Sequence, residues 1–260
     1  MAKNSFSSLF RKRENRYKAL AILIVPILVV MLVLGIFAYK QVKNILALVS
    51  DDPGSTTVDN KYVISSMNYV LRDNATEYQQ EIFAELKKDI ENPDEGITAE
   101  DIAGLIVKNH VADFYTWTNK IAQYDVGGLY YVNEDGRELV FTQARDTIYK
   151  YLNTYIEQYG ADQLLEVESV EVSVKAIGKY PVSYKTWYVD ENNPNDRGSY
   201  IYNDDMCDAY DVTATWTYKQ GGSFSSSKYP TSSMYRVVNN EREGRYEIVM
   251  AGETLKEVGE

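Results

Sequence analysis

Apolar positions follow two different periods along the chain, and the change falls near residue 164. Before that point they recur at intervals of three and four, which predicts amphipathic helices. The first helix is predicted at residues 75–90, where the apolar positions are Ala75, Tyr78, Ile82, Leu86 and Ile90. A second is predicted over residues 99–123, with Thr98 and Asp101 forming a capping box. A third is predicted within residues 142–160.

After residue 164 the period becomes two, which is typical of strands. Residues 210–219 place Tyr210, Val212, Ala214, Trp216 and Tyr218 on one face. The alternation in residues 164–177 changes phase, and a bulge near Ser169 would restore one buried face. Further strands are predicted at 182–189, 233–239 and 245–251. Helices followed by strands predict an α+β domain, with three helices packed on a bent antiparallel sheet of four to five strands.

An uninterrupted apolar run at residues 19–38 is long enough to cross a membrane as a helix. A cleaved signal peptide is the alternative, but the run exceeds a signal's apolar region, and Ile36 before Ala38 does not fit a cleavage site. The preceding eighteen residues carry a net charge of +5, and because the whole chain carries −11, the remainder carries −16. Basic flanks stay in the cytoplasm, so a cytoplasmic N-terminus and an extracytoplasmic C-terminal domain are predicted.

These features divide the chain into five segments. A basic cytoplasmic tail (1–18) precedes a single-pass transmembrane helix (19–39) and a stalk or linker (40–60), which contains Asp, Pro, Gly and Ser in residues 51–60. An extracytoplasmic α+β domain (61–254) and a C-terminal tail (255–260) complete the chain. The prediction is therefore a protein of the cell membrane.

The charge and the rare residues limit the possible functions. The acidic domain has no basic stripe for phosphates, so direct nucleic-acid binding by the domain is not expected. With one Cys and one His, neither an intrachain disulfide nor a zinc site from those ligands is possible. The acidic loop predicted at 190–208 offers oxygen ligands for calcium, but its spacing does not match an EF-hand, and a solvated loop is the alternative. No metal or cofactor is predicted.

The only histidine, His110, falls on the apolar face of the second predicted helix, with Phe114 and Trp117. Tyr115 is predicted to point away. A neutral, hydrogen-bonded core histidine is favoured over a general base, because a base needs a positioned partner and Asp113 is expected to meet solvent. No nucleophile elbow, HExxH motif or Walker loop occurs, so an enzyme is not predicted. A pocket between helices and sheet would be lined by His110, Phe114, Trp117 and Trp216, and is expected to close.

Tyrosine is unusually frequent, with 23 residues against 7 Phe and 3 Trp. Tyrosine can pack one edge of its ring and offer its hydroxyl to a partner, which is why protein interfaces favour it. Four tyrosines lie in predicted connections rather than in predicted strands or helices. They are the candidate partner-binding residues: Tyr130, Tyr131, Tyr200 and Tyr202.

The order of basic tail, anchor, stalk, three helices and bent sheet resembles the VirB-type bitopic scaffold proteins of bacterial type IV secretion and conjugation systems. The resemblance covers most of the chain and lies in architecture, not in a motif, so no contact residue is carried over from the family. It implies a cone-shaped fold like that of nuclear transport factor two. It also implies a non-enzymatic scaffold that contacts other channel proteins and further copies of itself. The alternative is an extracytoplasmic ligand-binding or sensory domain that uses the apolar pocket.

Overall fold

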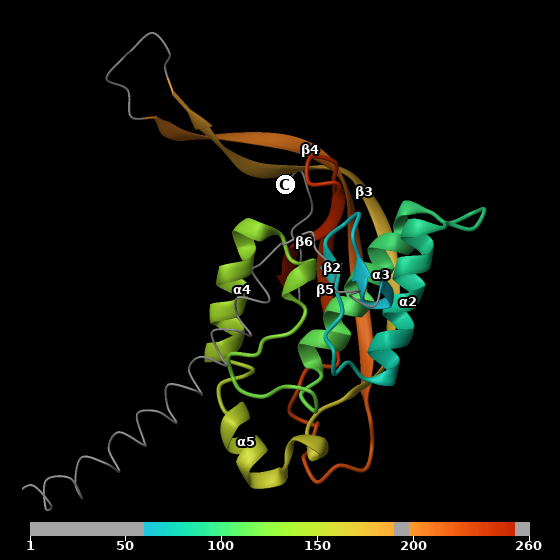
Figure 1. Ribbon diagram of the computed structural model, residues 1–260, viewed down its shortest axis with the longest axis vertical. Coiled ribbons are helices and arrows are strands. Elements are labelled where there is room, and N and C mark those ends of the chain that lie inside the picture. Colours follow the sequence, from blue (N-terminus) through green and yellow to red (C-terminus); the bar gives the residue numbers. More distant parts are fainter. Residues whose placement is uncertain (1–59, 190–197, 253–260) are drawn as a thin grey trace, which may run out of the picture. The chain divides into compact units, whose positions relative to one another are not determined.

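The computed structural model describes residues 60–189 and 198–252. The transmembrane helix predicted at 19–39, nearly all of the stalk and the C-terminal tail lie outside these residues. Within the described ranges, no helix has both the length and the apolar character needed to cross a membrane. The described residues form an α+β fold with four α-helices, a four-stranded antiparallel sheet and a separate two-stranded sheet (Figure 1).

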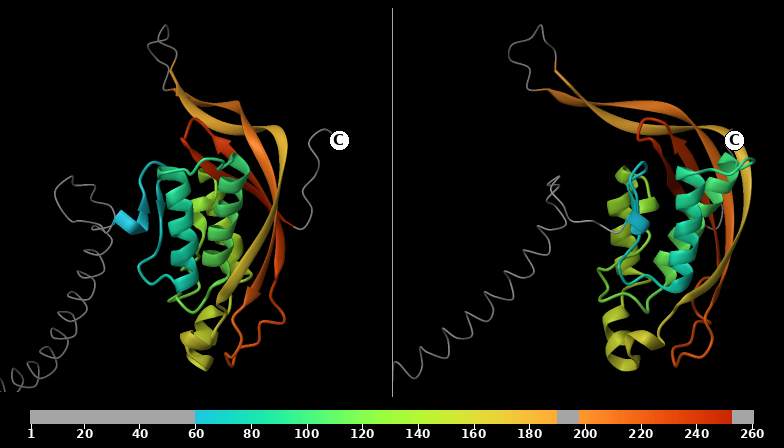
Figure 2. Two further views of the ribbon diagram at one scale, coloured as in Figure 1. Left: turned by 90° about the vertical axis from the view of Figure 1, so that its right-hand side faces the viewer. Right: turned by 45° about the vertical axis from the view of Figure 1, so that its right-hand side comes forward.

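Two helices make the layer that covers the large sheet. Helix α2 (Glu77–Glu91) and helix α3 (Ala99–Tyr115) each begin with a complete capping box. In α3 the box consists of Thr98 and Asp101, which confirms the sequence prediction. Helix α3 lies against the inner face of the sheet, and α2 packs beside it (Figure 2). Because α3 is enclosed by these neighbours, most of its side chains are buried.

Helix α3 ends at Tyr115, eight residues before the predicted end at residue 123. Its C-cap is Thr116, and the next two amide groups, of Trp117 and Thr118, both donate to the carbonyl of Leu165. Threonine favours extended backbone because its branched side chain is restricted in a helix. The helical period continues into Ile121, but this side chain is exposed. A tertiary contact therefore ends the helix where the periodicity predicted that it would continue.

The predicted third helix is in fact two, α4 (Glu134–Asp146) and α5 (Leu152–Tyr159). The break follows Thr147, whose hydroxyl donates to the carbonyl of Gln143. This local bond satisfies the helix end. The break turns Tyr149 into the core, where its hydroxyl donates to the carbonyl of Phe114 at 2.6 Å. The prediction of a single helix over 142–160 was therefore wrong.

The large sheet has the order β3-β4-β5-β6, and all neighbouring strands are antiparallel. Its strands are β3 (Val167–Tyr188), β4 (Ser199–Tyr218), β5 (Ser232–Asn240) and β6 (Arg245–Gly252). The small sheet pairs β1 (Val63–Ile64) with β2 (Tyr69–Val70). Three short 3-10 helices complete the described structure: η1 (Asn60–Tyr62), η2 (Leu129–Tyr131) and η3 (Ala161–Gln163).

The register of β3 against β4 confirms the predicted bulge, with a shift between Val167 and Ser169. A second shift lies between Ala176 and Gly178, and Gly178 has a φ of 85° that favours glycine. Both long strands curve around the helix layer (Figure 2). Two of the expected strands, 164–177 and 182–189, are one continuous strand. The loop predicted over 190–208 was also wrong in part, because residues 199–208 belong to β4.

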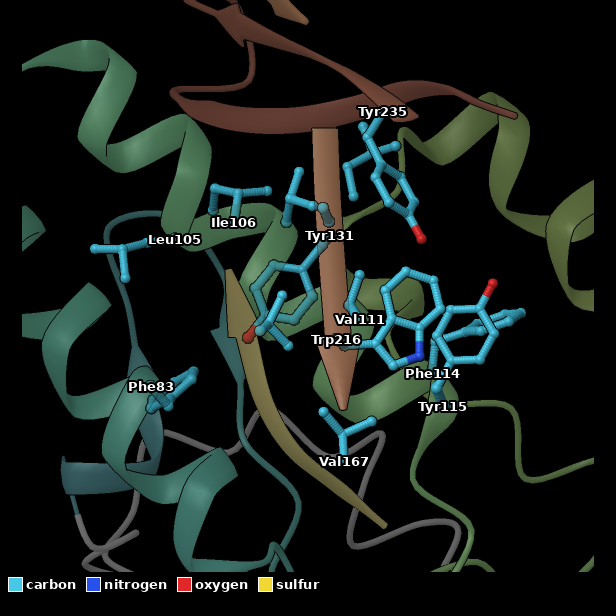
Figure 3. Close-up of a cluster of buried hydrophobic side chains, with 14 of the residues drawn as sticks. Phe83, Leu105, Ile106, Val111, Phe114, Tyr115, Tyr131, Val167, Trp216 and Tyr235 are labelled. Carbon is cyan, nitrogen blue, oxygen red and sulfur yellow. The ribbon is translucent and has the colours of Figure 1, made fainter. Parts of the chain in front are cut away.

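The inner face of the sheet carries the apolar residues that the two-residue period predicted. Val212 and Ala214 are fully buried, and the alternate positions Thr213 and Thr215 are exposed on the outer face. Trp216 stacks on Tyr115 of α3, with ring centroids 4.5 Å apart (Figure 3). Burial of this aromatic surface, together with aliphatic residues such as Val212 and Ile106, packs the helix layer on the sheet.

Strand β5 pairs with β4 only from Asp208 to Thr215, so β3 and β4 continue beyond the sheet as a two-stranded ribbon. Its base is buried by Val182 and Cys207, which pack with Val238. We call residues 183–188 and 199–204 the arm. The arm projects away from the helix layer (Figure 1). Each of its strands therefore has one edge that no other strand of the large sheet covers.

Hydrogen exchange should separate the two halves of β4. Residues 199–204 pair with one strand and bury little, whereas residues 209–215 pair on both sides within the core. We expect amide exchange roughly tenfold or more faster in the first group, because local opening there breaks fewer contacts. Hydrogen–deuterium exchange followed by mass spectrometry measures this. Equal protection along β4 would contradict an arm that stands free of the core.

Candidate interaction site

His110 is a core residue, as predicted. Its ring packs between Phe114 and Tyr235, with centroids 5.5 and 5.4 Å away, and only 4% of the residue is exposed. Nδ1 lies 2.9 Å from the carbonyl oxygen of Gly128. A carbonyl only accepts, so Nδ1 donates and carries the proton. Burial lowers the pKa of His110, because the charged form would lose its hydration, and the ring is neutral at pH 7.

The four residues predicted to line one pocket do not share one. His110 and Phe114 line a groove beside α4. Trp117 is fully buried beyond the end of α3, where its ring meets those of Tyr149 and Tyr229, and Trp216 is buried against Tyr115. Tyr115 was predicted to point away, but it is buried and stacks on Trp216. The early end of α3 explains the separation of Trp117 from the other two aromatic residues.

Asp113 does not point freely into solvent, which the sequence had predicted. Its carboxylate lies 2.6 Å from the Lys120 ammonium and 3.0 Å from Arg72 Nε, and it accepts the amide of Gly128. Burial alone would raise the pKa of Asp113, but the charges of Lys120 and Arg72 outweigh it and hold the pKa below its usual range. This ion-pair cluster ties the loop at Gly128 to α3. Arg72 is distant in sequence, and Lys120 lies beyond the end of α3, so no helical spacing signalled the cluster.

A groove of about 510 Å³ separates α4 from β6. Helix α4 contributes apolar residues that include Leu139 and Val140, and β6 contributes residues 248–251. Every residue that lines the groove is uncharged: His110, Phe114, Val132, Asn133, Gly136, Leu139, Val140, Gln143, Ala144, Thr147, Ile148, Ile248, Val249, Met250 and Ala251. The pocket expected to close between helices and sheet is therefore open on the α4 side.

The arm carries two of the candidate tyrosines, Tyr200 and Tyr202, which are 62% and 68% exposed. They lie on β4, not in a loop. The cross-strand pairs Trp187 with Tyr200 and Lys185 with Tyr202 place all four side chains on one face of the ribbon. The rings of Trp187 and Tyr200 meet edge to face with centroids 4.9 Å apart. An exposed aromatic cluster of this kind suits a protein contact.

Sequence analysis missed Trp187 and its neighbour Tyr188, both exposed on the arm. They lie in the strand predicted at 182–189, which was not singled out as a contact surface. The signal was present, because the adjacent residues Trp187, Tyr188 and Val189 interrupt the alternation that a half-buried strand requires. A strand with large apolar residues on both faces is unsuited to a sheet that has one solvated face.

The other two candidate tyrosines differ from each other. Tyr130 is exposed on η2, whereas Tyr131 is 3% exposed and its ring lies 5.1 Å from that of Tyr69. Tyr131 is therefore a core residue in this structure and not a surface anchor. The sequence offered no distinction, because both residues occupy a turn between predicted helices.

The aspartates at 190–208 that offered oxygen ligands lie partly outside the described residues, since 190–197 are not among them. In the described part of that loop, Asp204 accepts from Ser183, Asp205 pairs with Arg242 and Asp208 pairs with Lys179. Among residues 60–189 and 198–252, no group of three or more His, Cys, Asp or Glu could hold a metal ion.

A scan against protein-family models, a search of curated proteins and a search of solved structures give no match. The function is therefore inferred from the residues and their geometry.

The stability of the domain should fall as the pH drops below about 6.5, because the pKa of His110 is lowered in the folded chain. The unfolded chain takes up a proton below the ordinary histidine pKa of about 6.5, and the folded chain does not until a lower pH. The stability is therefore complete above pH 6.5 and is lost as the pH falls. Urea unfolding at several pH values measures this slope, and His110→Gln should flatten it, since the chain has no other histidine. An identical slope in both proteins would contradict a neutral buried His110.

Only glycine should fit at position 128 without loss of stability, because the backbone there lies close to His110. It has a φ of 73°, and an added Cβ would lie 2.8 Å from His110 Nδ1. Gly128→Ala should therefore lower the free energy of unfolding by more than about 1 kcal/mol. Gly136→Ala is the control, because this glycine lies in α4 with 3.9 Å to its nearest neighbour. The control should be neutral or stabilising by about 0.5–1 kcal/mol. Equal effects in denaturant titrations would rule out the close approach.

Proposed function

We propose that this chain is a membrane-anchored, non-enzymatic assembly subunit that works through protein contacts of its extracytoplasmic domain. The observation that carries the proposal is the arm, which presents Trp187, Tyr200 and Tyr202 outside the core. Trp and Tyr are the side chains most enriched at the centres of protein interfaces. An arm of this chemistry is suited to bind another protein.

The energetics of the arm support the same function. A two-stranded ribbon is marginally stable in water without a core beneath it. The rings on the arm remain in water, although burial of a large apolar side chain contributes about 1.5–3 kcal/mol. Neither feature benefits an isolated domain. Both are explained when the arm is covered by a partner.

The single histidine also favours a contact protein over an enzyme. His110 is buried, its Nδ1 donates to Gly128, and it packs between Phe114 and Tyr235. Asp113, the nearest carboxylate along the helix, is held by Lys120 and Arg72. A general base must reach the proton that it abstracts, and these contacts serve the core instead.

The sequence supplies the wider setting. We infer a single membrane span at 19–39, a cytoplasmic basic tail and an extracytoplasmic domain. The helix layer on a curved sheet is compatible with a cone-shaped fold like that of nuclear transport factor two, as in the VirB-type scaffolds of bacterial type IV secretion and conjugation. In that function the partners are other channel proteins and further copies of this chain. Anchoring in one membrane would strengthen weak contacts through avidity.

An extracytoplasmic ligand-binding or sensory domain is the second candidate. The groove between α4 and β6, at about 510 Å³, lies within the range of small-molecule sites, and this volume is what favours it. A sensor would be stabilised by a small apolar ligand, with a rise in unfolding temperature that Leu139→Glu in the groove abolishes. An assembly subunit would show no such ligand.

Substitutions on the arm test the assembly function. Tyr200→Ser should leave the unfolding temperature unchanged, because the ring is exposed. The amount of partner protein that co-purifies with the detergent-extracted full chain should fall at least tenfold. Tyr124→Ser is the matched control, because Tyr124 is also 62% exposed and lies outside the arm. Quantitative mass spectrometry of the extracted complexes measures both. The proposal fails if both variants retain the same partners as the original chain.

A further inference from the structure

Helix α4 packs Phe141 and Ala144 against the core but leaves part of its apolar side facing the groove between α4 and β6. Of its thirteen residues only Ala144 is buried, and Leu139 is 60% exposed. An amphipathic surface helix normally buries its apolar stripe against the core. Here Leu139 and Val140 line the groove, with β6 on its other side. An apolar group is therefore suited to the space between α4 and β6.

The opposite wall of the groove is an open sheet edge. Strand β6 ends the order β3-β4-β5-β6, and the segment before α4 covers it only at Ile248, through a parallel bridge from Val132 and the amide of Asn133 at 3.0 Å. The chain then turns into α4. No backbone hydrogen bond within residues 60–189 and 198–252 continues this pairing along Val249–Gly252. An open edge of this kind accepts an added strand.

Charge restricts the strand that can enter. The chain has a net charge of −11, yet every residue that lines the groove is uncharged. A charged segment would lose hydration there without an opposite charge in compensation. The occupant is therefore an extended, uncharged segment with large apolar side chains.

The chain itself contains such a segment. Residues 199–203 of β4 are uncharged, pair only with β3, and expose Tyr200, Ile201 and Tyr202. None of these residues lines the groove of its own copy. Within one copy the arm meets α4 through Lys185, which pairs with Asp135 at 3.3 Å. A second copy would supply the same strand from outside.

We propose that the arm of one copy adds residues 199–203 to β6 of a second copy, with Tyr200 and Tyr202 against α4 in the groove. The contact rests on the proposed function of the arm and names its partner as another copy of this chain. Backbone hydrogen bonds to Val249–Gly252 align the added strand with β6, and the two tyrosines cover Leu139 and Val140. Volume poses no obstacle, since two side chains are smaller than the ligands that grooves of this size hold.

This contact joins two different surfaces, so it does not close on itself as a twofold dimer does. Each copy that offers its arm keeps a free groove, and each copy that fills its groove keeps a free arm. Contacts of this type build rings or open chains. A set of anchored copies would thereby extend through one repeated interface.

The test is complementation between an arm variant and a groove variant of the full chain in detergent. The arm variant is Tyr200→Ser with Tyr202→Ser, and the groove variant is Leu139→Glu; all three positions are exposed, so the fold should persist. Each variant alone should associate at least tenfold more weakly than the original chain. Mixed together, they should form a heterodimer that grows no further, because one intact arm meets one intact groove. Sedimentation velocity at increasing concentration measures these masses.

Two further variants control for the added negative charge and for misfolding of Leu139→Glu. Thr142→Glu adds the same charge to α4 outside the groove lining and should associate like the original chain. Gln143→Glu changes one exposed lining residue with almost no change in size, and it should weaken association several-fold even if Leu139→Glu does not fold.

The outcomes separate this inference from the proposed function. An original chain that stays monomeric, a groove variant that associates normally, or a mixture that forms no heterodimer overturns the contact between copies. If Tyr200→Ser still loses other co-purifying proteins in that case, the assembly function stands and the partner is a different protein. If Tyr200→Ser loses neither copies nor other proteins, both proposals fail.

Discussion

The pairing of β3 with β4 extends well past the two other strands of the sheet, and the rest of the structure depends on that difference in length. Strand β5 pairs with β4 only from Asp208 to Thr215, so the inner half of the hairpin belongs to a four-stranded sheet and the outer half has no third strand beside it. The same strand thus buries Trp216 against α3 and exposes Tyr200 at the arm. One pair of strands, β3 and β4, therefore contributes both to the core and to the exposed contact surface.

The inner half fixes α3, and α3 in turn determines where the groove lies. The loop at Gly128 is held to α3 by His110 and Asp113. From there a short link reaches β6, where Val132 bridges Ile248, and the side chain of Asn133 caps the start of α4. The link covers one residue of the sheet edge before the helix begins. Leu139 of α4 therefore faces the groove beside an uncovered sheet edge.

Much of this fold can be predicted from the sequence, because long helices and strands with one buried face place apolar residues at a regular spacing. The first helix, the capping box at Thr98 and the bulge near Ser169 were all predicted. The end of α3 was not, since the helical period continues past Tyr115 and only the bonds to Leu165 stop it. The arm was missed for a related reason. A strand pattern shows which residues alternate but does not show whether a core lies beneath them.

The candidate site was predicted only in part for the same physical reason. Tyr200 and Tyr202 were found through composition and are exposed, but Tyr131, chosen on the same ground, is buried against Tyr69. Tyrosine suits core and interface equally, so its frequency cannot separate them. Of the groove, sequence analysis predicted His110 and Phe114 but not the walls from α4 and β6, because the groove depends on how those two elements are spaced.

The central claim is that the arm serves assembly and contributes little to the domain that carries it. The most direct measurement is the mass of the detergent-extracted particle formed by a full chain in which Asn-Gly replaces residues 184–203. That dipeptide favours a tight hairpin turn, and Ser183 and Asp204 already face each other across the ribbon. The account predicts a particle reduced to the single chain, with an unfolding temperature close to the original. A particle of undiminished mass would contradict it.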